Sequence, residues 1–205
     1  GELTPRARRA GAVNTLVLDS AAVLGDNTDG AGLVRDLRDN LGLVVAKRRV
    51  LLAGAGGAAR GVLAPLLELG PVEMVIASRT AERARALAAD FEALGPVRGC
   101  AFDELSLGSF DLILNATSAS LSGDVPAIPP AAVSATTVCY DMAYAKSDTA
   151  FVRWARERGC ERAVQGWGML VEQAAESFRI WRGVRPDTAP VLALLQQPGS
   201  ATFPP

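Results

Sequence analysis

The sequence predicts an α/β fold built on a doubly wound parallel sheet, with helices on both faces of the sheet. Short apolar runs alternate with helical patterns along most of the chain, as in consecutive βαβ units. A glycine-rich turn separates one of these apolar runs from the helical pattern that follows it. The 205 residues, 49% of them hydrophobic and 21% charged, are enough to bury a sizeable core.

The stretch "VLLAGAGGAARGVLAPLLELG" at 50–70 is typical of a buried strand, a turn and a helix. Gly54, Gly56 and Ala59 fit the GxGxxG/A spacing of a Rossmann-like turn, whose backbone N–H groups approach a pyrophosphate. The anion would lie at the helix N-terminus, where N–H groups lack intrahelical partners. Alone the pattern is weak, because chains rich in alanine and glycine produce it by chance. The strand–helix–strand context strengthens it.

The second βα unit indicates which dinucleotide binds. "EMVIASR" at 73–79 predicts a buried strand, and "AERARALAADFEALG" at 81–95 predicts an amphipathic helix closed by glycine. NAD sites usually place a carboxylate at the end of this strand to bind the ribose 2′-hydroxyl. Here Arg79 and Arg83 occupy the region, and the guanidinium group suits a 2′-phosphate. We therefore predict NADP. The alternative is that both arginines are solvated residues of a helix start.

The alternation of strands and helices continues to the C-terminus. Asn115 and Thr117 follow the next apolar run, at the carboxyl end of a strand, where ligands of such sheets bind. The remaining expected elements are strands within 111–117 and 137–143, a proline-rich connector at 122–136, and helices at 149–159, 168–183 and 189–197. Residues 198–205 are expected to be loose.

Polar side chains gather upstream of the glycine turn. Asp26, Asn27, Thr28 and Asp29 immediately precede a helical pattern, and Asn14 lies in "AVNT". Thr28 or Asp29 has an ordinary structural interpretation as a helix cap. Asn14 has one as an amide bonded to backbone at a strand edge. Their joint appearance before a dinucleotide-binding pattern favours a functional interpretation.

Composition excludes several classes of function. A net charge of −1 and a pI near 5.6 argue against nucleic acid or an anionic membrane as a partner. We expect no signal peptide, and the sequence contains no membrane-spanning apolar run. Cys100, Cys139 and Cys160 lack zinc-type spacing and predict buried thiols in a reducing cytoplasm. Histidine is absent, so no metal is expected and acid–base work falls to Asp, Glu, Lys or Tyr.

Eight segments carry a family resemblance over nearly the whole chain. They are, in order, "AGAVNTL", "GDNTDG", "GAGGAARGV", "SRT", "LILNATS", "SGDVPAIP", "YDMAY" and "GMLVEQA". The sequence resembles the shikimate dehydrogenase family. The resemblance implies reversible, NADP-linked reduction of the ring ketone of 3-dehydroshikimate to shikimate, a step of aromatic amino-acid biosynthesis. It implies a polyhydroxylated cyclohexene carboxylate as substrate.

The resemblance also implies roles for individual residues. Asn14 and Asp29 would bind ring hydroxyls, Asp29 being one of the family's two catalytic groups, and Gln173 and Tyr144 would lie beside the ring. Met142 and Met169 would approach the nicotinamide. The alternative is that these methionines only fill space in the hydrophobic core. The implied cofactor residues are Gly54, Gly56, Gly57, Ala58 and Ala59 at the pyrophosphate, Ser78, Arg79, Thr80 and Arg83 around the adenosine phosphate, and Asn115, Thr117, Met142, Gly166 and Met169 further along.

The sequence departs from the family pattern at several positions. Ser78 stands where Asn is usual, which predicts a weaker adenosine contact. Gln165 and Trp167 stand where Asp and Leu are more usual, so we expect a different nicotinamide rim. By the resemblance, a serine pair and a proton-transferring lysine precede "AVNT", and neither Lys47 nor Lys146 matches that lysine.

These departures suggest a fragment, with most of the substrate domain absent. We expect residues 1–29 to be a remnant of the substrate domain and 30–166 to form the NADP-binding domain. Residues 167–197 would be helices returning toward the substrate domain. The 205-residue chain should then bind NADP without turning over shikimate. A monomer or homodimer is expected.

Two other functions are compatible with the same patterns. A paralogue that also oxidises quinate often uses NAD, which the arginines at 79 and 83 disfavour. A non-catalytic NADP-binding module is the second alternative. The substrate groups implied by the resemblance, Asn14, Asp29 and Gln173, favour an enzyme.

Overall fold

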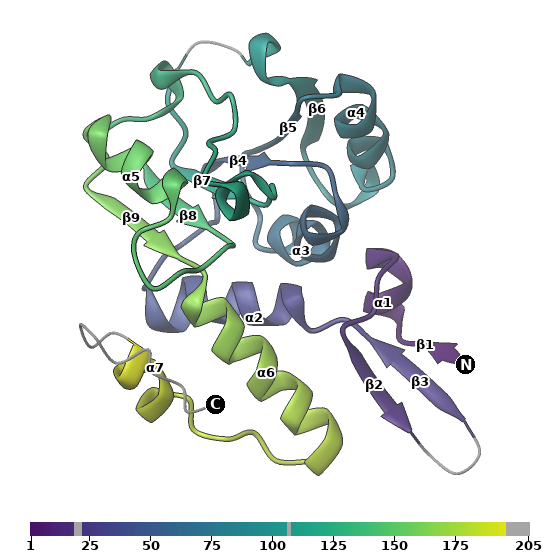
Figure 1. Cartoon of the computed structure of the whole chain (residues 1–205). Coiled ribbons are helices and arrows are strands. Elements are labelled where there is room, and N and C mark those ends of the chain that lie inside the picture. Colours follow the sequence, from purple (N-terminus) through teal and green to yellow (C-terminus); the bar gives the residue numbers. More distant parts are fainter. Residues whose placement is uncertain (19–21, 106–107, 196–205) are drawn as a thin grey trace.

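The computed structural model describes residues 1–18, 22–105 and 108–195 (Figure 1). The terminal segment 198–205, expected to be loose, lies outside the described residues. The described part contains two sheets and the helices that pack against them.

The larger sheet has six parallel strands in the order β6-β5-β4-β7-β8-β9. The chain runs outward from β4 through β5 to β6, and then returns to β7 on the other side of β4. The predicted parallel α/β fold is confirmed. The strands β6 and β9 were not expected from the sequence. The six strands are β4 (Arg49–Ala53), β5 (Glu73–Ser78), β6 (Val97–Ala101), β7 (Leu112–Asn115), β8 (Val138–Asp141) and β9 (Arg162–Gln165).

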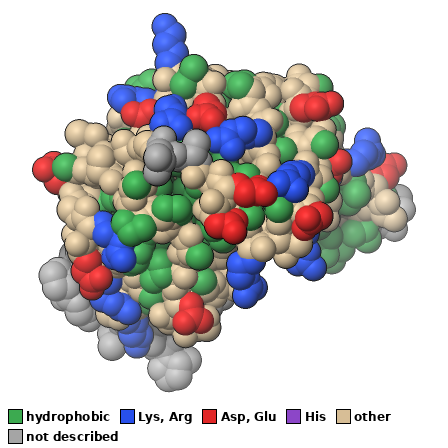
Figure 2. All heavy atoms as spheres, turned by 90° about the horizontal axis from the view of Figure 1, so that it is seen from above, with side chains coloured by type: hydrophobic (Ala, Val, Ile, Leu, Met, Phe, Trp, Pro, Cys, Tyr) green, Lys and Arg blue, Asp and Glu red, His purple; other side chains and the backbone are tan. Residues whose placement is uncertain are grey.

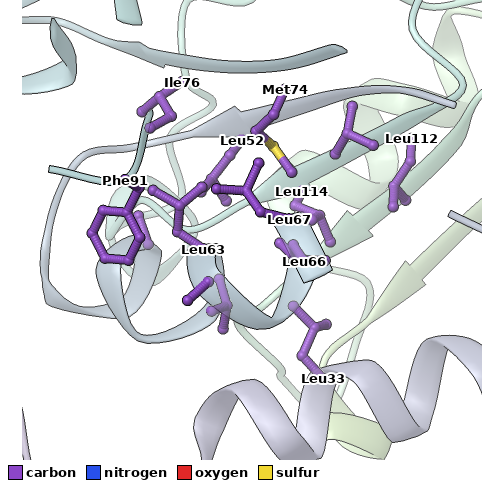
Figure 3. Packing of buried hydrophobic residues seen from close by; sticks show 14 of the residues in the cluster. Leu33, Leu52, Leu63, Leu66, Leu67, Met74, Ile76, Phe91, Leu112 and Leu114 are labelled. Atoms are coloured by element: carbon purple, nitrogen blue, oxygen red, sulfur yellow. The ribbon is translucent and has the colours of Figure 1, made fainter. Parts of the chain in front are cut away.

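Helices pack on both faces of this sheet. One face is covered by α2 (Asp29–Arg35), α3 (Gly57–Glu68), α4 (Ala81–Ala89) and the start of α6 (Trp167–Arg182). Figure 3 shows how leucines of α2 and α3 meet the side chains of the strands. The labelled residues of this core are Leu33, Leu52, Leu63, Leu66, Leu67, Met74, Ile76, Phe91, Leu112 and Leu114. The opposite face packs against α5 (Ala150–Glu157) and the connecting segments.

The helix expected at 81–95 is shorter than predicted. It ends at Ala89, and a 3-10 turn at Glu92–Leu94 follows. Phe91 leaves the helical path, with φ at −120°, and its ring is buried beneath the guanidinium of Arg60, 5.3 Å from the ring centroid. Glu92, Ala93 and Leu94 all favour helix, but burial of this ring outweighs their propensity, which is a small preference per residue.

The smaller sheet has the order β1-β3-β2, with β1 parallel and β2 antiparallel to β3. Its elements are β1 (Glu2–Leu3), α1 (Pro5–Ala10), β2 (Thr15–Leu18) and β3 (Val23–Asp26). In Figure 1, α2 and α6 cross beneath the larger sheet, and α6 runs toward the smaller sheet. The indole N–H of Trp181 donates to the carbonyl of Leu16 at 2.8 Å. The helix α7 (Ala189–Leu195) contacts α6.

A buried carboxylate joins α2 and α6 to the larger sheet. Asp36 begins the π-helical turn Asp36–Asn40 and is only 3% exposed. It accepts hydrogen bonds from the hydroxyl of Tyr140 at 2.6 Å and from the amide of Asn40 at 2.9 Å. The backbone N–H of Met169, in the first turn of α6, also donates to it. Burial raises the pKa of Asp36.

Charged side chains of both signs are interspersed on the face of Figure 2. In the part of the chain that the structure describes, no helix is long and apolar enough to span a bilayer. The same ranges hold no cluster of side chains with the donors for a metal ion.

We predict that Gly99→Ala destabilises the larger sheet. A Cβ at this position of β6 would lie 2.2 Å from the backbone carbonyl of Ala84 in α4, so helix and strand must separate. The expected loss is roughly 1–3 kcal/mol of unfolding free energy, typical of overpacked cores. Urea unfolding of the ligand-free protein measures it. Gly57→Ala is the control, because its Cβ meets nothing within 4 Å. Equal losses for the two variants would contradict the packing described.

Candidate functional site

A cleft of about 1010 Å³ opens at the carboxyl ends of the strands. It includes the turns after β4 and β7, between which the strand order reverses, the usual place for ligands of open α/β sheets. Residues near the smaller sheet complete it. The lining residues are Asn14, Asp29, Gly54, Ala55, Gly56, Gly57, Ala58, Ser78, Arg79, Thr80, Arg83, Phe102, Ala116, Thr117, Ser118, Met142, Ala143, Tyr144, Gly166, Met169, Leu170 and Gln173.

The glycine turn presents bare backbone to this cleft. Gly54 has φ of 111°, and a Cβ there would lie 3.0 Å from the carbonyl oxygen of Ala116, so only glycine fits without strain. A Cβ on Gly56 or Gly57 would meet nothing within 4 Å. No side chain caps α3, which begins at Gly57. Its first N–H groups are therefore available to an anion.

Ala59 does not line the cleft, although the sequence placed it among the cofactor residues. It is fully buried in the core between α3 and the sheet. The third position of the fingerprint allows close helix–strand packing, and a small side chain serves that purpose here.

Two arginines stand at the edge of the cleft without carboxylate partners among the described residues. The side chains of Arg79 and Arg83 are exposed and lie beside Thr80. By contrast, Arg85 donates to Glu104 at 2.7 Å, and Arg60 donates to Asp90 at 2.5 Å. Two unneutralised guanidinium groups at a cleft edge offer the donors that a phosphate requires. Their exposure also fits the alternative of a solvated helix start.

Ser78 shapes the turn that carries these arginines. Its hydroxyl donates to the carbonyl of Thr80 at 2.7 Å and accepts the N–H of Thr80 at 3.1 Å. Both bonds hold the backbone between β5 and α4. The side chain of Ser78 thus stabilises the turn and also lines the cleft.

Asn115, expected at the cofactor, is fully buried and lies outside the cleft lining. Its amide donates to Asp141 at 3.0 Å, and its carbonyl oxygen accepts from the hydroxyl of Thr117 at 2.7 Å. Asp141 also accepts hydrogen bonds from Ser120 and Thr149, each at 2.6 Å. Burial raises the pKa of Asp141. This network holds the loop that presents Thr117 to the cleft.

Met142, Gly166 and Met169 lie together at the start of α6. A Cβ on Gly166 would come within 2.5 Å of the carbonyl oxygen of Met142, so the two segments touch backbone to backbone. Met169 is 7% exposed and belongs to the core as well as to the cleft. The core interpretation of Met169 therefore holds alongside its place in the site.

Asn14 and Asp29 form a hydrogen-bonded pair on the cleft wall. The amide of Asn14 donates to Asp29 at 2.7 Å, and its carbonyl oxygen accepts the N–H of Thr28 at 2.9 Å. The hydroxyl of Thr28 donates to Gln173 at 3.1 Å. Burial raises the pKa of Asp29, while the bond from Asn14 opposes this shift.

The helix-cap interpretation of Thr28 and Asp29 is wrong. Thr28 occupies the N-cap position of α2, but its side chain makes no capping bond. The carboxylate of Asp29 bonds Asn14 instead, and the carbonyl oxygen of the Asn27 side chain accepts the Asp29 N–H at 3.1 Å. The backbone interpretation of Asn14 is confirmed in part, since it accepts the Thr28 N–H while it also holds Asp29.

Asp141 organises the site without having been expected there from the sequence, and the same is true of the side-chain hydrogen bonds of Thr28. Asp141 ends a buried parallel strand, and a polar residue at that place is itself a signal of a site. Thr28 was part of the polar group given a functional interpretation, but its hydrogen bonds could not be foreseen, because its partners Asn14 and Gln173 are distant along the chain.

Comparisons with known proteins agree with this geometry. Residues 37–123 match the profile described as "Shikimate / quinate 5-dehydrogenase", and 166–196 match "Shikimate 5'-dehydrogenase C-terminal domain". A "Shikimate dehydrogenase (NADP(+))" of Saccharophagus degradans is 50% identical over 96% of this chain and 73% of that relative. The chain belongs to the shikimate dehydrogenase family. The relative of that name from Aeromonas salmonicida is 55% identical over 95% of this chain and 71% of its own.

Solved structures of this family share the fold. An Ael1 enzyme from Pseudomonas putida is 45% identical, with a TM-score of 0.90 over 96% of this chain and 72% of the other. A shikimate dehydrogenase in complex with NADP+ is 32% identical, with a TM-score of 0.79 over 92% of this chain and 67% of that one. The family resemblance seen in the sequence is confirmed.

The raised pKa of Asp29 gives a pH-dependent prediction for stability. In the folded protein, burial favours the neutral carboxyl, so ionisation in wild type lowers the unfolding free energy as pH rises above 3.8, the ordinary pKa of an aspartate. Asp29→Asn removes this titration and keeps an acceptor for Asn14. Its unfolding free energy, relative to wild type, should therefore increase with pH above that value.

Urea unfolding at a series of pH values measures this difference. Glu176→Gln is the opposite-sign control, because arginine partners lower the pKa of Glu176 from 4.5 to about 2. Its stability relative to wild type should fall as pH rises between those two values. If the difference in unfolding free energy between Asp29→Asn and wild type did not change with pH, the burial of this carboxylate would be contradicted.

Proposed function

We propose that this chain carries the cofactor site, and part of the substrate site, of an NADP-dependent shikimate dehydrogenase. The reaction is the reversible reduction of 3-dehydroshikimate to shikimate in aromatic amino-acid biosynthesis. One observation carries the proposal: a single cleft joins the glycine turn, two unpaired arginines and the Asn14–Asp29 pair. The relatives named as NADP-dependent shikimate dehydrogenases support it.

The described residues fit NADP. The bare turn at Gly54 and Gly56 leaves space that side chains would fill, and the N-terminus of α3 supplies donors for the pyrophosphate. Arg79, Thr80 and Arg83 would hold the 2′-phosphate. The nicotinamide side would be formed by Met142, Gly166 and Met169. When bound, the cofactor supplies or accepts the hydride.

The opposite side of the cleft suits a hydroxylated ring. Asn14, Asp29 and Gln173 offer neighbouring donors and acceptors, as ring hydroxyls require. Asp29 accepts a hydrogen bond from a hydroxyl of the ring. It also takes part in the proton transfer that accompanies hydride movement. Because burial raises its pKa, this carboxylate is a stronger base than an ordinary surface aspartate.

We assign residues 1–29 to the substrate domain, 30–166 to the NADP domain, and 167–197 to helices that return toward the substrate domain. Contacts of α6 with β2 support the last assignment. We also place the enzyme in the cytoplasm, because Cys100, Cys139 and Cys160 are buried free thiols.

Arg79→Ala should separate the two nicotinamide cofactors. Each charged hydrogen bond contributes roughly 1.5–3 kcal/mol, so the variant should bind NADP about tenfold or more weakly. The affinity for NAD should stay nearly constant, because NAD lacks the 2′-phosphate. Calorimetric titration with both cofactors measures the effect. Arg85→Ala is the matched control, since Arg85 already pairs with Glu104. Equal losses for NADP and NAD would contradict the phosphate clamp.

The rate of shikimate oxidation tests the proposed catalytic role of this chain and of Asp29. By the family resemblance no lysine among these 205 residues matches the proton-transferring lysine, so the chain alone should bind NADP but form no NADPH from shikimate. Adding the upstream segment of a longer relative, fused or as a separate chain, should restore turnover. In that active form, Asp29→Asn should lower the rate by roughly a hundredfold or more. NADPH absorbance measures both rates.

Two results would overturn this account. Robust turnover by the 205-residue chain alone would show that the proton donor lies within it. A normal rate for Asp29→Asn in the active form would exclude Asp29 from proton transfer.

A further inference from the structure

Gln165 and Trp167 surround the glycine that leads from β9 into α6. Gln165 pairs with Asp141 at the ends of β9 and β8, and Gly166 N–H donates to the carbonyl of Ala143 at 3.0 Å. The segment after β9 thus runs directly beside the loop after β8.

Gln165 fastens that loop at two points. Its side-chain oxygen accepts the N–H of Ala145 at 2.7 Å, and its amide donates to the carbonyl of Ser147 at 3.2 Å. An aspartate at this position offers acceptors only, so it cannot donate to Ser147. The glutamine therefore supplies both the acceptor and the donor that the loop requires.

Trp167 supports the tyrosine at the tip of the same loop. The rings of Tyr144 and Trp167 have centroids 4.5 Å apart and planes inclined by 41°, within the range of favourable aromatic pairs. Tyr144 is 43% exposed and lines the cleft. Its hydroxyl makes no hydrogen bond with any other described residue, so the phenol is open to a ligand.

We propose that Gln165 and Trp167 are positioning residues that hold Tyr144 on the wall of the cleft. Gln165 fixes the backbone on the C-terminal side of Tyr144, and Trp167 fixes the ring itself. This inference rests on the proposed function: the position of the Tyr144 ring sets where its hydroxyl meets the hydroxyl or carboxylate groups of the ring substrate. The pair thereby takes part in choosing among hydroxylated ring acids.

The test uses fluorine NMR of protein labelled with 3-fluorotyrosine. The chain has only two tyrosines, and Tyr140 is fully buried beside Asp36, which makes it an internal reference. The ring current of Trp167 should displace the Tyr144 signal from that of free fluorotyrosine. Trp167→Leu should abolish this displacement and leave the Tyr140 signal in place.

Further variants separate positioning from general damage. Trp167→Phe should restore part of the displacement, and Gln165→Leu should shift or broaden the Tyr144 signal alone. Trp181→Leu is the matched control, since Trp181 lies far along the same helix and bonds Leu16. It should leave both tyrosine signals unchanged. In the active form described above, Trp167→Leu should raise KM for shikimate by roughly three- to tenfold, with kcat within about twofold.

A Tyr144 signal that is the same in wild type and Trp167→Leu would overturn the proposal, as would loss of both tyrosine signals in Gln165→Leu. The proposed function fails separately, by absence of NADP binding to the wild-type chain in calorimetry. Tyr144 would still report its contact with Trp167 in that case.

Discussion

The buried carboxylate of Asp36 is the contact on which the arrangement of the site depends. It binds Tyr140 of the sheet, Asn40 of the turn after α2 and the first turn of α6 at the same time. A Cβ on Gly168 would lie 1.9 Å from its carboxylate, so α6 approaches Asp36 closely. The helix α6 carries Met169 and Gln173 into the cleft. The anchoring of its N-terminus therefore sets the positions of both side chains.

The middle of α6 is held by ion pairs. Glu176 is 8% exposed and binds Arg6, Arg179 and Arg185. The hydrogen bonds and charges of Arg179 and Arg6 lower its pKa to about 2. Arg6 also pairs with Asp26 of β3 at 2.6 Å. Buried carboxylates that keep all their partners define one arrangement and penalise others. This network therefore fixes the smaller sheet, and with it Asn14 and Asp29, relative to α6.

The sequence could predict the parts of the site that depend on local patterns. The glycine turn and the arginines after β5 follow from residue types at fixed spacing. It could not predict β6, because "VRGCA" has no apolar run, or β9, because "RAVQ" has only two apolar residues between polar ones. Nor could spacing show that Asn115 and Ala59 turn inward. The Asn14–Asp29 bond and the anchoring by Asp36 join residues distant along the chain, and tertiary packing decides such contacts.

The central claim is that the cleft binds a dinucleotide through its 2′-phosphate. Phosphorus NMR of NADP titrated with the chain tests it directly, because the 2′-phosphate and the pyrophosphate give separate signals. Two guanidinium groups beside a phosphate stabilise its dianion. We expect the 2′-phosphate signal to shift on binding and its pKa to fall below that of free NADP. A bound pyrophosphate signal beside a 2′-phosphate that titrates as in free NADP would contradict the claim.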